Sequence, residues 1–160
     1  MADAQPPVPP ELAADAERIA AVVAGHAALT GRPLVDPAGD IVAAVWHAPL
    51  VILAHGVESD PRFFLGNRLA LRAFETTLAD LRRMPSRLSA EPGLRDERAR
   101  LLARVTAQGF IDDYAGIRIS ARGRRFPIAR ATVWNVHDAA GNRVGQAAAF
   151  APPPHAIIPD

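Results

Sequence analysis

The chain has 160 residues, which suffices for one domain with a hydrophobic core but not comfortably for two. It has no cysteine, which excludes disulfides, thiolate nucleophiles and Cys-ligated zinc. The net charge of +1 hides an uneven distribution, because residues 1–61 hold 2 Arg against 8 acidic residues whereas residues 62–130 hold 15 Arg against 7.

The N-terminal part begins with a proline-rich stretch and continues into one amphipathic helix. Residues 1–9 lack apolar periodicity and are expected to be disordered. Residues 10–29 carry an apolar stripe at helical spacing, and Gly31 is placed to end that helix. The stripe consists of Leu12, Ala16, Ile19, Val23 and Ala27. The N-terminus shows no basic segment followed by an apolar core, so a cytoplasmic protein is the default expectation.

Two short strands are predicted next. The turn-rich connector GRPLVDPAGD leads into an apolar run, residues 41–54, whose residues 51–53 are the first strand candidate. His47 and Pro49 interrupt the run, which is also shorter than the roughly 20 residues of a membrane helix. Residues 62–65 are the second strand candidate.

Three helices follow, each marked by a start or stop signal. Asn67 can cap the first, and Thr77 with Asp80 three residues later resembles a capping box for the second. The third is predicted over residues 92–108, because Pro92 suits a first turn and Gly109 can close the helix.

Residues 109–150 are predicted to form three consecutive antiparallel strands. Short polar or glycine-containing breaks at residues 121–124 and 138–142 are typical of hairpin turns. In the long strand 125–136, alternation predicts one face with Phe126, Ile128, Thr132, Trp134 and Val136 and an opposite face with Ala129, Ala131 and Val133.

The order of helix, two strands, three helices and three strands indicates an α+β domain over residues 10–150. Both faces of the long strand are apolar, so both need a cover. We expect a five-stranded antiparallel sheet with the short internal helices on one face and the N-terminal helix on the other. Residues 151–160 form a proline-rich tail that is expected to be extended or disordered.

Four tracts resemble a known family: APLVILAHGVESDPRFFLGNRLALRAFE, PSRLSAEP, GFIDDYAGIRISARGRRF and VWNVHDAAGNRVGQAAAF. From Trp46 to Phe150, about two thirds of the chain, the sequence is similar to stand-alone bacterial MEKHLA-domain proteins. That family is similar to PAS sensor domains and also occurs at the C-terminus of plant homeodomain leucine-zipper regulators. This sequence lacks the Met-Glu-Lys-His-Leu-Ala string that names the family. The resemblance implies a PAS-like fold and a sensory or regulatory role without naming a ligand.

Three kinds of cofactor find no support in the sequence. A flavin photosensor of the PAS class forms its adduct with a Cys, which this chain lacks. The haem-binding PAS proteins place a His on the long helix, and residues 92–108 contain none. No metal-ligand spacing connects the histidines His26, His47, His55, His137 and His155.

His55 is the most informative candidate for a functional side chain, because it ends an apolar strand just before Gly56, where a polar group could point into a pocket. Histidines at strand ends and aromatic residues of a sheet more often serve packing than binding. The residues that we predict to line a ligand pocket are His55, Asn67, Phe74, Arg87, Glu91, Leu102, Tyr114 and Trp134.

These observations favour a module that binds a small, mostly apolar ligand or a protein partner, with a possible homodimer through the N-terminal helix and no membrane association. No catalytic motif is present, so we do not expect an enzyme. Two alternatives stay open. A small pocket enzyme could use His55 as a general base with Glu58, Asp60 or Glu91. A nucleic-acid binder would require the Arg side chains to gather on one face, which the helical positions do not favour.

Overall fold

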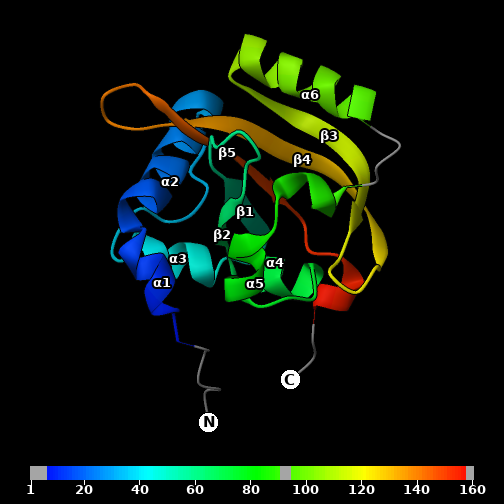
Figure 1. Ribbon diagram of the computed structural model, residues 1–160. Coiled ribbons are helices and arrows are strands. Elements are labelled where there is room, and N and C mark those ends of the chain that lie inside the picture. The colour runs from blue at the N-terminus through cyan, green and yellow to red at the C-terminus, as the bar shows by residue number, and fades with distance from the viewer. Residues whose placement is uncertain (1–6, 91–94, 158–160) are drawn as a thin grey trace.

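The computed structural model describes residues 7–90 and 95–157, and its centre is an antiparallel sheet between two layers of helices (Figure 1). The strands are β1 (Val51–His55), β2 (Phe63–Gly66), β3 (Phe110–Ile119), β4 (Arg125–His137) and β5 (Arg143–Phe150). They lie in the order β2-β1-β5-β4-β3, so β5, the last strand of the sequence, occupies the centre. The predicted five-stranded antiparallel sheet is confirmed.

One face of the sheet, called the outer face here, is covered by the N-terminal helices α1 (Pro10–Ala14), α2 (Ala16–Thr30) and α3 (Ile41–Trp46). Figure 1 shows α2, in blue, lying against β4. The indole of Trp134 is fully buried there, and its Nε1–H donates a hydrogen bond of 3.1 Å to the carbonyl oxygen of Val22. The prediction that the N-terminal helix covers one face of the sheet is confirmed.

Two local features of this outer layer differ from the sequence prediction. The helix expected over residues 10–29 is divided at Asp15, whose carboxylate accepts hydrogen bonds from Arg18 and from Arg82 of a distant helix. The helix α3 was not predicted, because the sequence between residues 41 and 46 was assigned to the run leading into a strand. Its start is set by Asp40, whose side chain accepts from the backbone N–H of Ala43 at 3.1 Å.

The other face, called the inner face, is covered by α4 (Arg68–Ala73), α5 (Leu78–Arg83), the 3₁₀ turn η1 (Ser86–Ser89) and α6 (Arg95–Gln108). The expected caps are present, since Asn67 accepts from Ala70 N–H and Thr77 from Asp80 N–H. Gly109, with φ +85°, ends α6 as predicted. The predicted start of this helix at Pro92 lies outside the described residues.

The long strand β4 does not keep one alternation along its length, which corrects the sequence prediction. Arg130 has a left-handed backbone, φ +54°, and the pairing with β3 shifts its register beside it. One extra residue in a strand exchanges the faces of all residues beyond it. Phe126 and Ile128 therefore point to the inner face, whereas Trp134 and Val136 point to the outer face.

The C-terminal tail is partly structured, contrary to the expectation for residues 151–160. A 3₁₀ turn, η3 (Pro154–Ala156), packs beside α4, as Figure 1 shows in red. Ala156 is fully buried, and the Nε2–H of His155 donates to the carbonyl oxygen of Ala73 at 2.8 Å. Residues 158–160, like residues 1–6 at the other end, lie outside the described part.

His26 makes the packing of α2 sensitive to pH. Its ring is 8% exposed, stands edge-on to Trp134 at a centroid distance of 4.9 Å, and donates from Nδ1 to the carbonyl oxygen of Arg32. Burial lowers the pKa of His26 below its usual value of 6.5, although the hydrogen bond to Arg32 partly opposes this. The unfolded chain thus binds the proton more readily than the folded one.

We therefore expect the melting temperature to fall as pH drops below about 6.5, because the stabilisation from neutral His26 is complete above the unfolded pKa and is lost toward the lowered folded pKa. Thermal melts of the wild type and of His26→Gln between pH 7.5 and pH 5.5 measure this. The variant should lose less melting temperature over that interval. Equal losses in both proteins would show that burial does not lower the pKa of His26 in the folded protein.

Candidate functional site

The candidate site is a cavity of about 50 Å³ between the inner face of the sheet and the helices that cover it. Most of its wall is apolar and comes from Leu53, Phe63, Phe74, Leu101, Leu102, Val133, Ala148 and Phe150. The polar side chains in the wall are His55, Ser86, Ser89, Arg118 and Gln146. An apolar cavity with a few convergent polar groups is the usual form of a small-molecule site.

Three polar side chains lie side by side across the sheet and are called the polar row; two of them, His55 and Gln146, line the cavity. His55 on β1 is paired with Gln146 on β5, and Gln146 is paired with Asn135 on β4. Gln146 and Asn135 are each 7% exposed, and the Nε2–H of Gln146 donates to Oδ1 of Asn135 at 3.2 Å. Buried amides at the edge of an apolar space can orient a ligand through donor and acceptor groups.

The tautomer of neutral His55 follows from the hydrogen bond that its ring makes to the backbone of Gly56. Its Nδ1 lies 2.9 Å from the carbonyl oxygen of Gly56, which can only accept, so Nδ1 carries the proton. In the neutral ring Nε2 then holds the lone pair. The ring also stands edge-on to Phe63 at a centroid distance of 6.4 Å. His55 is therefore held by its local surroundings in an orientation that leaves it part of the cavity wall.

Of the residues predicted for the pocket, the structure brings His55, Phe74 and Leu102 together in the cavity wall. Tyr114 packs on the same face but lies beneath Arg118, whose guanidinium carbon is 5.3 Å from the ring centroid. Trp134 points to the opposite face, because the bulge at Arg130 reverses the alternation that placed it with Phe126.

The remaining predicted pocket residues have other positions. Asn67 is fully buried but serves the backbone, since its side chain accepts from Ile52 and Ala70 and donates to Val45 and Leu50. Arg87 is exposed and forms an ion pair with Asp60. Glu91 lies outside the described residues.

Of the polar row, only His55 was identified from the sequence. Gln146 and Asn135 were missed, and so were Ser86 and Ser89 of η1. Gln146 and Asn135 each stand between non-polar neighbours in a buried stretch of their strand. A polar residue in a buried run is uncommon, so these two amides were the available signal. Ser86 and Ser89 offered no such signal, because their burial depends on how η1 folds against the β1–β2 loop, residues 56–62.

A second hollow, of about 540 Å³, lies between α2 and the β4–β5 hairpin. Its floor consists of small side chains such as Ala20, Ala21 and Ala24, and its rim carries Glu17 and Asp138. Its lining comes from α2 and from residues of the hairpin such as His137 and Val144. The inner cavity, which combines burial with convergent polar groups, is the better candidate for a ligand.

The described part of the chain has neither a metal-binding cluster nor a membrane-spanning helix. Within residues 7–90 and 95–157, no three His, Asp or Glu side chains are grouped so that they could hold a metal ion. Over the same residues, no helix has the length and apolar character needed to cross a bilayer.

Comparison with known proteins gives a family and a fold. The model of the MEKHLA domain family matches residues 16–152. Two rice proteins, both homeobox-leucine zipper protein HOX29, from Oryza sativa subsp. indica and subsp. japonica, are 31% identical over 101 residues. The match covers 63% of this chain but only 12% of theirs. These relatives are plant proteins, so they do not bear out the expected bacterial type.

Solved structures of PAS and Light-Oxygen-Voltage domains are similar in fold. The PAS domain of a Colwellia psychrerythraea protein has a TM-score of 0.58 at 12% identity, covering 67% of this chain and 88% of that one. A Light-Oxygen-Voltage domain studied with a flavin analogue has a TM-score of 0.56 at 13% identity, with 70% and 83% covered. An RNA-binding Light-Oxygen-Voltage receptor reaches 0.56 at 16% identity, with 69% and 31% covered. At these identities the likeness shows the PAS fold alone.

Proposed function

The chain belongs to the MEKHLA domain family, and from that membership we propose that it is a sensory or regulatory module that binds a small, mostly apolar molecule in its inner cavity. The observation that supports this most is the polar row at the end of an apolar cavity. Apolar walls supply affinity through burial, whereas the buried amide of Gln146, which is hydrogen-bonded to Asn135, supplies orientation.

Native mass spectrometry of the protein purified from its own host tests the proposal. We expect a mass above that of the polypeptide, because a retained ligand adds its own mass. Ala148→Leu puts three more carbons into the cavity wall and should remove the added mass. Leu29→Ala, an exposed position on α2, is the matched control and should keep it. An added mass that survives Ala148→Leu, or none in the wild type, would count against binding in this cavity.

The same spectra address cofactors. The sequence excludes a Cys adduct with flavin, and the absence of flavin and haem stays a prediction. A cavity of about 50 Å³ is also far smaller than the roughly 300 Å³ or more of common ligand sites, so a large cofactor would need a substantial rearrangement. Either cofactor would be identified by its mass and its visible absorbance.

A protein partner is the second possibility for such a module. The apolar stripe of the N-terminal helices is buried on the sheet of the same chain, with Leu12, Ile19 and Val22 fully buried. These side chains are therefore not available to a second copy. The homodimer through the N-terminal helix stays a prediction, and it would have to use the exposed face of α2.

The two other functions considered from the sequence gain no specific support. For the enzyme with His55 as base, the carboxylate of Glu58 lies against Gly56, the residue after His55. The carboxylate of Asp60 is engaged by Arg87, and Glu91 lies outside the described residues. For a nucleic-acid binder, arginines of several elements are already paired with carboxylates, which reduces the free positive charge. Those pairs are Arg18 and Arg82 with Asp15, Arg83 with Asp80, Arg87 with Asp60, Arg104 with Asp113, and Arg124 with Glu75.

A further inference from the structure

The inner cavity is too small in this conformation for the molecule proposed above. About 50 Å³ accommodates a few water molecules, whereas sites for drug-sized ligands measure about 300–1,000 Å³. On the sheet side most of the cavity wall comes from β1, β5 and β4, each hydrogen-bonded to a neighbour on both edges, and the edge strands β2 and β3 add Phe63 and Arg118. A wall that moves to admit a ligand must therefore come from the helical side.

The elements on the helical side of the cavity differ in how much buried apolar surface holds them in place. Leu69 of α4 and Leu81 of α5 are buried in the core. In η1 the buried side chains are those of Ser86 and Ser89, and Leu88, its large apolar residue, is 52% exposed. Little apolar surface therefore holds η1 in place. Segments with few buried apolar contacts are the ones that open locally at the lowest free energy.

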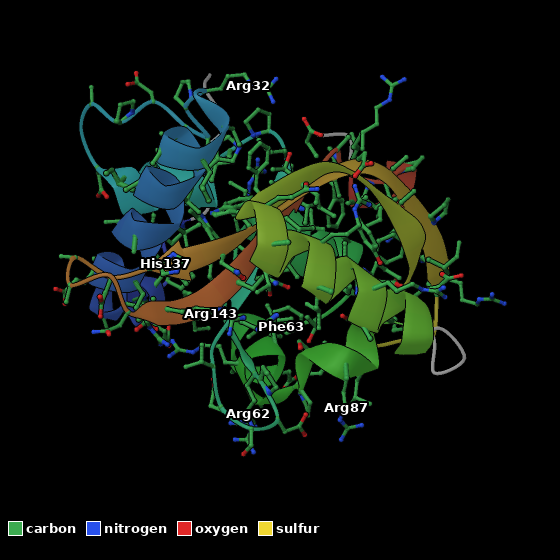
Figure 2. All side chains as sticks on the ribbon, turned by 90° about the horizontal axis from the view of Figure 1, so that it is seen from above. Arg32, Arg62, Phe63, Arg87, His137 and Arg143 are labelled. Atoms are coloured by element: carbon green, nitrogen blue, oxygen red, sulfur yellow. The ribbon has the colours of Figure 1, made fainter. Side chains whose placement is uncertain are left out.

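Polar contacts with the β1–β2 loop fasten η1 instead. They include the hydrogen bond of 2.8 Å from Ser86 N–H to the carbonyl oxygen of Pro61, the antiparallel bridge between Arg62 and Pro85, and the ion pair of 3.2 Å between Arg87 and Asp60. Figure 2 shows Arg62 and Arg87 together at one edge of the molecule, with Phe63 of the cavity wall further in. On its other side, the segment forms a bridge from Ala90 to Arg118.

We infer that residues 85–90 form a flap over the inner cavity, and that the contacts to the β1–β2 loop are the latch that keeps it closed. Displacement of the flap removes the serine wall of the cavity and widens its opening to solvent beside His55 and Phe63. The rest of the sheet and the apolar helices stay in place. This inference rests on the proposed function, because it describes how a ligand reaches the same cavity.

Thiol labelling tests the flap without any ligand. The chain has no cysteine, so Ser89→Cys introduces a single buried thiol whose reaction rate with 5,5′-dithiobis(2-nitrobenzoate) reports opening. Ala73→Cys, on α4 and also fully buried, reports opening of the remaining structure. We expect the thiol of Ser89→Cys to react at least about tenfold faster than that of Ala73→Cys. Adding Arg87→Gln to Ser89→Cys should raise the rate roughly two- to fivefold, the range for an exposed ion pair, and adding Leu88→Ala should not.

A reversible lock tests the passage into the cavity. Opposite residues of an antiparallel bridge lie about 4.5–5.5 Å apart between Cα atoms, which suits a disulfide, so the pair Arg62→Cys and Pro85→Cys can be oxidised across the latch. The probe is 1-anilinonaphthalene-8-sulfonate, whose fluorescence rises in apolar surroundings. We expect uptake to be at least about tenfold slower in the oxidised protein and to recover when dithiothreitol is added. Ala148→Leu identifies the part of the signal that comes from the cavity.

The outcomes separate the two proposals. Equal uptake in the oxidised and reduced proteins, with a signal that Ala148→Leu abolishes, would overturn the flap and leave cavity binding standing. A signal that Ala148→Leu does not change would contradict cavity binding, and the thiol rates would still decide whether the flap opens. Equal labelling rates for Ser89→Cys and Ala73→Cys would overturn the flap directly. If Ser89→Cys fails to fold, hydrogen exchange of the Ser86 amide in the wild type, compared with amides of β5, gives the same decision.

Discussion

Replacing Asn67 with alanine is expected to lower the free energy of unfolding by about 4 kcal/mol, since four backbone groups, three of them buried, each lose a partner at about 1 kcal/mol or more. The side chain is fully buried. Its Oδ1 accepts from the backbone N–H groups of Ile52 and Ala70, and its Nδ2 donates to the carbonyl oxygens of Val45 and Leu50. One amide thus joins the end of α3, the start of β1 and the start of α4.

Urea denaturation measures this loss, and two variants make it interpretable. Thr77→Ala removes an exposed helix cap of the same kind and should cost only about 1 kcal/mol. Asn67→Asp keeps an acceptor for the two N–H groups but cannot donate to Val45 and Leu50, so it should remain strongly destabilising. A loss for Asn67→Ala no larger than that for Thr77→Ala would mean that water or another group replaces the side chain.

Deletion of residues 1–30 is expected to abolish the folded state. Leu12, Ile19, Val22 and Val23 are buried on the outer face, and full burial of such side chains contributes about 1.5–3 kcal/mol each. The sum of about 6–12 kcal/mol is as large as the whole stability of a typical domain, about 5–15 kcal/mol. Trp134 and its neighbours on the outer face would then be exposed, which favours aggregation.

Light scattering and circular dichroism of residues 31–160 measure the outcome. Ile19→Asp places a charge in the same buried interface and should act in the same direction, whereas Ala28→Asp on the exposed side of α2 should leave melting nearly unchanged. A truncated protein that stays soluble, with unchanged mass and unchanged melting, would show that α1 and α2 do not stabilise the sheet.

Features that depend on local chemistry could be predicted from the sequence. Gly109, Gly123 and Gly141 all adopt positive φ at the ends of elements where turns were expected. The caps at Asn67 and Thr77 likewise follow from side chains that satisfy the first N–H groups of a helix. Because both faces of the long strand are apolar, the sequence also predicted that the N-terminal helix covers one face of the sheet and the internal helices cover the other.

Features that depend on tertiary packing could not be predicted. Arg130 is not a residue type that favours a left-handed backbone, so the bulge it forms left no mark in the alternation. Trp134 was consequently assigned to the wrong face and to the pocket. The burial of η3 depends on a contact between His155 and Ala73, which are far apart in the sequence. Of the candidate site, the histidine at the strand end could be found from the sequence, whereas the buried amides beside it were missed.

The central place of β5 has a consequence for how the chain acquires its structure during synthesis. The hairpin β1–β2 and the hairpin β3–β4 pair with β5 and not with each other. Neither half of the sheet can therefore join the other until residues 143–150 have left the ribosome. Until then the chain carries two hairpins with unpaired edges, which are prone to wrong association. Synthesis that stalls before residue 143 should accordingly yield nascent chains that chaperones retain. Chains whose residues 143–150 have left the ribosome should no longer be retained.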